Sequence, residues 1–133
     1  MTATNDKQIH TARCLCGAIT LEARGSVSNT AICHCDMCKR ASGAAFVHWI
    51  TFMAEDFTVI KGELAFYRSG EKSKRGYCRD CGSSLTFHFP GTVDIAIGCM
   101  DRPADYPGTK HIWTTRQVRH VNIVDDLPRF EKE

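Results

Sequence analysis

Seven of the eight cysteines in this 133-residue chain lie in three short clusters. They read C-L-C-G at residues 14–17, C-H-C-D-M-C at residues 33–38 and C-R-D-C-G at residues 78–82. Spacings of one and two residues are typical of metal ligands, because two thiolates so placed can bind one ion from a single turn. Structural zinc takes four protein ligands, whereas catalytic zinc usually keeps three and one open position. Seven cysteines therefore predict one closed site and one open site.

The first and last clusters each offer two thiols followed by a glycine. Gly17 and Gly82 permit the positive φ that folds a turn back, with its N–H groups toward sulfur. Two such pairs have enough ligands to close a four-cysteine site, although spacing alone does not settle which pairs share an ion. A structural zinc contributes on the order of 10–16 kcal/mol, against a net domain stability of about 5–15 kcal/mol. Loss of this ion is therefore expected to unfold the protein. The four residues are Cys14, Cys16, Cys78 and Cys81.

The middle cluster supplies three thiols, Cys33, Cys35 and Cys38, from one short segment. Zinc bound by three thiolates has a vacant position for a water or an external thiol, and a thiol that binds there loses its proton. The basic pair Lys39 and Arg40 follows directly, and could balance the charge or hold a carboxylate of an incoming ligand. The alternative for this pair is a solvated helix end.

Other interpretations of the middle cluster remain open on the sequence alone. A second structural zinc could be closed by Cys99, His48 or His111. Cys99 ends an apolar strand, where a buried free thiol is the commoner fate. His34 lies between two cysteines and is expected to be a hydrogen-bond donor beside the metal. A zinc-dependent hydrolase needs a general base, for which Asp36 is the carboxylate inside the cluster.

Composition indicates one globular domain rather than a nucleic-acid or membrane protein. The net charge is +2, with 43% hydrophobic and 24% charged residues, which are ordinary values. The polar N-terminus lacks a signal peptide, and no stretch approaches the ~18 apolar residues of a membrane span. We therefore expect a cytoplasmic protein, in which thiols stay reduced and a disulfide framework is disfavoured.

We expect residues 1–10 to be a flexible N-terminus and residues 11–133 a zinc-binding domain. The basic residues near position 75 are expected to form a solvated turn: Lys72, Lys74, Arg75 and Arg79.

Strand patterns dominate the regions between the clusters. Period-two alternation and turn residues predict a mainly β, mostly antiparallel fold with the cysteine clusters at strand ends. A hairpin is expected around residues 61–63, and a Pro90-Gly91 turn before the strand that begins at Val93. Helical signal is weak, and its best candidate is a short turn from Asp36 to Ala41. The expected strands are 19–23, 46–51, 57–61, 64–68, 85–89 and 93–97.

The order of the three clusters resembles the glutathione-dependent formaldehyde-activating enzyme family, also called the GFA/CENP-V family. Further matches are the Gly98–Asp101 turn, the His111–Trp113 segment and the closing Asp125–Phe130 segment. The resemblance implies irregular, layered β-sheets around zinc. It also implies that the first and last cysteine pairs share a structural zinc and that the middle three cysteines hold a second, catalytic-type zinc.

The family resemblance also implies an activity. The named reaction joins formaldehyde to glutathione as cosubstrate, which makes the protein a carbon–sulfur lyase acting on a small thiol and a small carbonyl compound. Lys39 and Arg40 are then candidates to bind the carboxylates of glutathione. The rival interpretation is a non-enzymatic zinc-binding module for a partner protein or nucleic acid, since some relatives are linked to chromatin. The net charge of +2 argues against nucleic acid, which requires a basic face.

Overall fold

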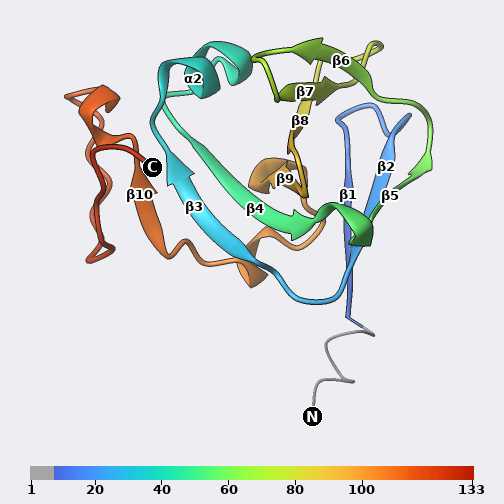
Figure 1. Cartoon of the computed structure of the whole chain (residues 1–133), viewed down its shortest axis with the longest axis horizontal. Coiled ribbons are helices and arrows are strands. Elements are labelled where there is room, and N and C mark those ends of the chain that lie inside the picture. The colour runs from blue at the N-terminus through green and yellow to red at the C-terminus, as the bar shows by residue number, and fades with distance from the viewer. Residues whose placement is uncertain (1–7) are drawn as a thin grey trace.

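Two β-sheets form the fold in the computed structural model, which describes residues 8–133 (Figure 1). Within these residues, three short 3-10 helices lie between strands and a fourth follows the last strand: η1 (Ala54–Asp56), η2 (Ile97–Cys99), η3 (Pro103–Asp105) and η4 (Thr114–Arg116). The strands and the α-helix, in chain order, are β1 (Ile9–Arg13), β2 (Thr20–Arg24), β3 (Asn29–Cys33), α2 (Asp36–Ser42), β4 (Val47–Met53), β5 (Phe57–Lys61), β6 (Ala65–Arg68), β7 (Lys74–Tyr77), β8 (Ser84–Phe89), β9 (Thr92–Ala96) and β10 (Lys110–Ile112).

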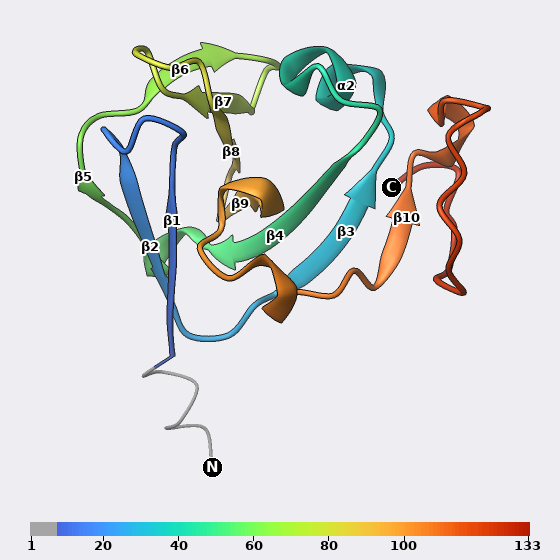
Figure 2. The ribbon, with the colours of Figure 1, turned by 180° about the vertical axis from the view of Figure 1, so that it is seen from behind.

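The smaller sheet has the order β1-β2-β5, and the larger one has the order β10-β3-β4-β9-β8-β7-β6. The pairs within both sheets are antiparallel, except that β10 lies parallel to β3 (Figure 2). The prediction of a mainly β, layered fold with few helices is confirmed. The helix α2 lies at the end of β3 (Figure 1), and it confirms the short helical turn expected from Asp36.

The main hydrophobic core lies between the two sheets. Alternation along β2 places Leu21 and Ala23 on one face, where both are buried, together with Ile19 just before the strand. From the larger sheet, Ile50 and Ile95 pack into the same core. Both side chains are buried, with exposed fractions of 0% and 1%. Because strand side chains alternate between faces, the neighbours of these core residues project from the other face of the larger sheet.

The expected hairpin around residues 61–63 is wrong. β5 pairs with β2 in the smaller sheet, whereas β6 pairs with β7 at the edge of the larger one. The chain crosses between the sheets at Gly62, which has φ +78°, and a Cβ atom there would lie 2.2 Å from the carbonyl oxygen of Ala18. Lys61-Gly62-Glu63 is therefore a crossing point rather than a hairpin turn. The β8–β9 hairpin does form around Pro90-Gly91.

The segment expected to be a flexible N-terminus, residues 1–10, lies mostly outside the described residues. Ile9 and His10 of that segment are the first residues of β1 and pair with Arg24 and Ala23 of β2. Within residues 8–133, no helix combines the length and the apolar character needed to cross a membrane.

Candidate metal centres

The first and last cysteine clusters meet where the two sheets come together. Cys14 directly follows β1 of the smaller sheet, and Cys78 directly follows β7 of the larger one. The Sγ atom of Cys16 lies 3.7 Å from that of Cys14 and 3.8 Å from that of Cys78. With Cys81, all four sulfur atoms lie within 4.8 Å of one another. Four thiols at this separation could hold one metal ion, which would link the sheets.

Both cysteine turns have the backbone geometry expected of metal-binding turns. Gly17 and Gly82 have φ values of +81° and +79°. The backbone N–H of Ile19 donates to Cys14 Sγ at 3.3 Å, which stabilises negative charge on the sulfur.

Ser83 connects the two turns through its hydroxyl group. The Ser83 oxygen accepts a hydrogen bond from the backbone N–H of Leu15 at 2.9 Å and lies 3.2 Å from Cys81 Sγ. Hydrogen bonding by the Ser83 side chain lowers the pKa of the Cys81 thiol to about 5. A thiolate at neutral pH is the form that binds metal.

The middle cluster is positioned by the junction between a strand and a helix. Cys33 ends β3, Cys35 is the N-cap residue of α2, and Cys38 lies in the helix. The backbone N–H of Cys38 donates to Cys35 Sγ at 3.3 Å, and the Sγ atoms of Cys33 and Cys38 are 3.6 Å apart. Hydrogen bonds with the side chains of Cys33 and Cys38 lower the pKa of the Cys35 thiol, and the bond with Cys33 has the larger effect. The three sulfur atoms lie within 4.8 Å of one another and could also hold an ion.

None of the three expected candidates for a fourth ligand belongs to this group within residues 8–133. Cys99 packs beside the four-cysteine cluster instead, and burial raises the pKa of its thiol to about 11. His111 contacts His34 at 2.9 Å through one ring nitrogen and Asp125 at 2.9 Å through the other. His48 lies opposite Ile32 in register, so it projects from the face opposite that of the neighbouring position Cys33.

The structure adds Arg75, which the sequence analysis did not assign to the site. The expectation of a solvated basic turn is wrong for this residue, which is only 7% exposed, on β7. Its two terminal guanidinium nitrogens lie 3.7 and 3.8 Å from Cys38 Sγ. The Trp49 indole N–H donates to the same sulfur at 3.4 Å. Cys38 Sγ is thus surrounded by donors, as suits a thiolate.

A cavity of about 660 Å³ opens beside the three cysteines. Its floor includes a row of residues in cross-strand register over four strands: Thr51, Asp94, Phe87 and Arg75. Burial raises the pKa of Asp94 to about 6, although a hydrogen bond with Thr51 and the charge of Arg75 act in the opposite direction. The row therefore sets a titratable carboxyl group and a cation on the wall of the cavity. The residues that form the remaining walls are Met37, Trp49, Phe89, Thr92, Ile112 and Trp113, with Asp36, Arg116 and Glu133.

The basic residues singled out from the sequence lie elsewhere. Lys39 forms an ion pair with Asp36 at 3.3 Å and donates to the carbonyl oxygen of Arg116. Arg40 is exposed, and neither Lys39 nor Arg40 lines the cavity, whereas Arg116 does. The carboxylate-binding role of Lys39 and Arg40 stays a prediction.

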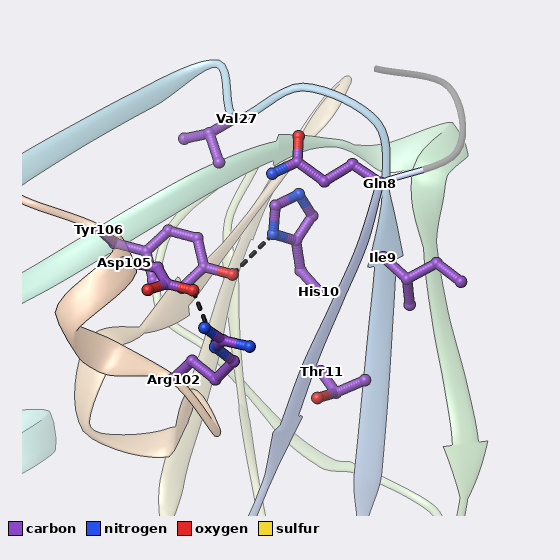
Figure 3. Close-up of a pocket in the computed structure, with 8 residues that line it drawn as sticks. All are labelled: Gln8, Ile9, His10, Thr11, Val27, Arg102, Asp105 and Tyr106. Atoms are coloured by element: carbon purple, nitrogen blue, oxygen red, sulfur yellow. Dashed lines mark hydrogen bonds and ion pairs between the residues drawn. The ribbon is translucent and has the colours of Figure 1, made fainter. Parts of the chain in front are cut away.

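A smaller cavity of about 190 Å³ lies between β1 and η3 (Pro103–Asp105) (Figure 3). His10 contacts the Tyr106 hydroxyl at 2.6 Å and the carbonyl oxygen of Gly25 at 2.8 Å. Arg102 and Asp105 form an ion pair at 3.0 Å (Figure 3). Because both ring nitrogens of His10 have partners, the arrangement is that of a structural contact between β1 and the η3 segment.

Comparisons with known proteins bear on the fold and on the family. A crystal structure of a Rhodobacter sphaeroides protein matches with a TM-score of 0.59 and 21% identity, over 90% of this chain and 98% of that one. That likeness supports the fold. No curated protein matches the chain. The sequence model described as "Glutathione-dependent formaldehyde-activating enzyme" matches residues 9–116, which contain all seven clustered cysteines. The chain therefore belongs to the glutathione-dependent formaldehyde-activating enzyme family.

Proposed function

We propose that this protein is a carbon–sulfur lyase-type enzyme that adds a small thiol, with glutathione as the candidate, to formaldehyde or another small carbonyl compound. The observation that carries the proposal is the three-thiol group of Cys33, Cys35 and Cys38, which opens onto a cavity and has no fourth His, Cys, Asp or Glu ligand atom among residues 8–133. The family description supports the reaction class. A cytoplasmic location belongs to the same proposal, because thiols stay reduced there.

The two cysteine groups fit two zinc ions with different roles. Four thiols with sulfur atoms within 4.8 Å of one another complete the tetrahedral ligand set of a structural zinc. The structural ligands are Cys14, Cys16, Cys78 and Cys81. Three thiols leave a position for an outside ligand, and zinc in such a site lowers the pKa of a thiol that binds to it. We expect native mass spectrometry of the reduced protein to find two zinc ions per chain.

The protein's own residues prepare the cavity for a thiolate. Three thiolates around a divalent cation carry a net charge of −1, and an incoming thiolate would add to it. Arg75 lies against Cys38 Sγ and balances part of this charge from inside the protein, where a cation acts more strongly than in solvent. Arg116 lies at the cavity wall, where it pairs with Asp36 at 3.3 Å, and it is a candidate partner for a carboxylate of the thiol compound.

The reaction needs one proton to move. The thiol loses its proton, the sulfur forms a bond to the carbonyl carbon, and the π electron pair of the carbonyl group moves to oxygen. The oxygen then takes up a proton, so that a thiol and an aldehyde give a hydroxyalkyl thioether without loss of atoms. Asp94 lines the cavity, and burial raises its pKa to about 6. It is therefore suited to hold and pass a proton near neutral pH.

The test is the rate at which glutathione and formaldehyde exchange with their adduct. Because this addition is easy without a catalyst, the measurement is NMR magnetisation exchange at equilibrium with and without zinc-loaded protein. We expect faster exchange with the wild type and with the matched control Cys99→Ser, and no acceleration with Cys35→Ser. Equal rates for wild type, Cys35→Ser and buffer would overturn the proposed activity.

A further inference from the structure

The cavity beside the three-cysteine group is much larger than formaldehyde requires. Its volume is about 660 Å³, whereas a molecule the size of water takes up about 30 Å³ of liquid, and formaldehyde has only two non-hydrogen atoms. Volumes of roughly 300–1,000 Å³ are typical of pockets for larger organic ligands. The size of the cavity therefore indicates a larger occupant than formaldehyde and a thiol group alone.

The walls of the cavity are mainly aromatic and aliphatic. Trp49, Phe87 and Trp113 form part of the wall next to the cysteines and pack against the cluster of Cys33 and Cys38. Met37, Phe89 and Ile112 extend the same apolar surface. The ring centroids of Trp49 and Phe87 are 6.2 Å apart and the rings are tilted by 48°, so that two neighbouring aromatic side chains help to form this wall.

Apart from Thr92 and Glu133, the charged and hydroxyl-bearing residues of the cavity fall into two groups. Thr51, Asp94 and Arg75 share the cross-strand row on the sheet, while Asp36 and Arg116 pair with each other at 3.3 Å. Glutathione carries two carboxylates and an ammonium group, so it does not match an apolar wall. The apolar wall of the cavity matches an apolar substituent on the ligand. Because glutathione does not carry one, the carbonyl compound must supply it.

We propose that this cavity binds an aldehyde with an apolar, ring-sized substituent, which packs against the wall formed by Trp49, Phe87 and Trp113. This inference rests on the proposed function and names the substrate class of the same site. The thiol sulfur bonds to the aldehyde carbon. The thiol gives up one proton and the former carbonyl oxygen takes up one, so that no atoms are lost. The product is a hydroxyalkyl thioether that carries the ring.

The cavity provides its own optical probe for a test that needs no activity. The chain has two tryptophans, Trp49 and Trp113, and both line the cavity. The experiment titrates the full-length, zinc-loaded protein with cyclohexylmethanol and follows tryptophan fluorescence. This alcohol has the ring but neither the reactive carbonyl group nor a thiol. Methanol, which carries no ring, is the matched ligand control.

We expect saturable binding of cyclohexylmethanol, at least tenfold tighter than that of methanol. Phe87→Ala, inside the cavity, should weaken binding about tenfold, and Phe66→Ala, a control on β6 outside the cavity, should leave it unchanged. If Phe87→Ala does not fold, Phe89→Ala serves instead, because Phe89 lines the cavity but is 49% exposed. The aldehyde itself, cyclohexanecarbaldehyde, should exchange with glutathione faster on the enzyme than formaldehyde does.

The outcomes separate this inference from the proposed function. No saturable response to cyclohexylmethanol, or equal binding of both alcohols, would overturn the substrate class while leaving thiol addition to formaldehyde intact. Ring binding together with a cobalt-substituted site that ignores glutathione would instead overturn the thiol chemistry. Binding that is weakened equally by Phe87→Ala and Phe66→Ala would place the ring outside this cavity and would contradict the inference.

Discussion

A terminal guanidinium nitrogen of Arg75 lies 3.7 Å from the Sγ atom of Cys38, although the two residues are 37 positions apart in the sequence. Arg75 is buried on β7 and stacks over the Phe87 ring, with 4.7 Å between its central guanidinium carbon and the ring centroid. Arg75 forms no ion pair with a carboxylate among residues 8–133. A buried cation is costly unless it meets negative charge. The three-cysteine group supplies that charge when its thiols are ionised.

Replacement of Arg75 by Gln should weaken metal binding at the three-cysteine group by about 10–100-fold, which is the usual effect of losing a group that supports metal ligands. The four-cysteine site should be unaffected, because Arg75 contacts only the other group. A chelator competition that resolves the two ions measures both affinities. Arg79→Gln is the control, since Arg79 is exposed beside Cys78. Equal losses in the two variants would contradict the role of Arg75.

Removal of a ligand from the four-cysteine group should destabilise the fold more than removal of one from the three-cysteine group. Cys14 and Cys78 follow strands of different sheets, so an ion held by them joins both layers of the core. Cys81→Ser is expected to cost on the order of 5 kcal/mol or to prevent folding, and Cys35→Ser much less. Thermal unfolding followed by circular dichroism compares them. A chelated wild type that keeps its melting temperature would refute the structural role.

Asp94→Asn should stabilise the protein at alkaline pH. The pKa of Asp94 is raised from 3.8 to about 6 by burial, so the folded state binds the proton more tightly than the unfolded state. Folding stability therefore falls as pH rises from about 4 through 6. Without the carboxylate, we expect a gain of about 2 kcal/mol at pH 8 and a smaller one at pH 5.

Urea unfolding at these two pH values checks the expectation for Asp94. Asp80→Asn, at an exposed position, is the matched control and should change stability little at either pH. A gain from Asp94→Asn that does not depend on pH would show that burial of the carboxylate is not its cause.

Gly62→Ala should be strongly destabilising, because Gly62 has both a positive φ and no room for a Cβ atom. Gly91 is the matched control, with φ +88° and nothing within 4 Å of the added atom. We expect about 1 kcal/mol of backbone strain for Gly91→Ala and at least 3 kcal/mol for Gly62→Ala. Denaturant unfolding measures both. Equal costs would mean that the fold does not depend on the close approach of Gly62 to Ala18.

Short-range patterns carried much of the prediction. The spacing within each cysteine cluster and the glycine after it predicted turns that the structure contains at Gly17 and Gly82. Alternation along residues 19–23 predicted a face that is indeed buried. These features depend on neighbours a few residues away, so the sequence displays them directly.

Long-range pairing accounts for what the sequence analysis missed. The sequence analysis placed Arg75 in a solvated basic run. Its burial depends on the pairing of β7 with β8 and on the position of α2, which neighbouring residues in the sequence do not reveal. Asp94 gave no signal either, since only the register of β9 with β4 and β8 places it beside Thr51 and Phe87. The false hairpin at residues 61–63 has the same origin, because local turn residues do not reveal that two adjacent strands join different sheets.

The most direct test of the account is the visible absorption spectrum of the cobalt(II)-substituted protein during a titration with glutathione. We predict that glutathione changes the bands of one of two bound cobalt ions, and that Cys35→Ser abolishes this change while Cys99→Ser preserves it. A wild-type spectrum with both ions bound that ignores glutathione would contradict the claim that Cys33, Cys35 and Cys38 hold an open site for a thiol.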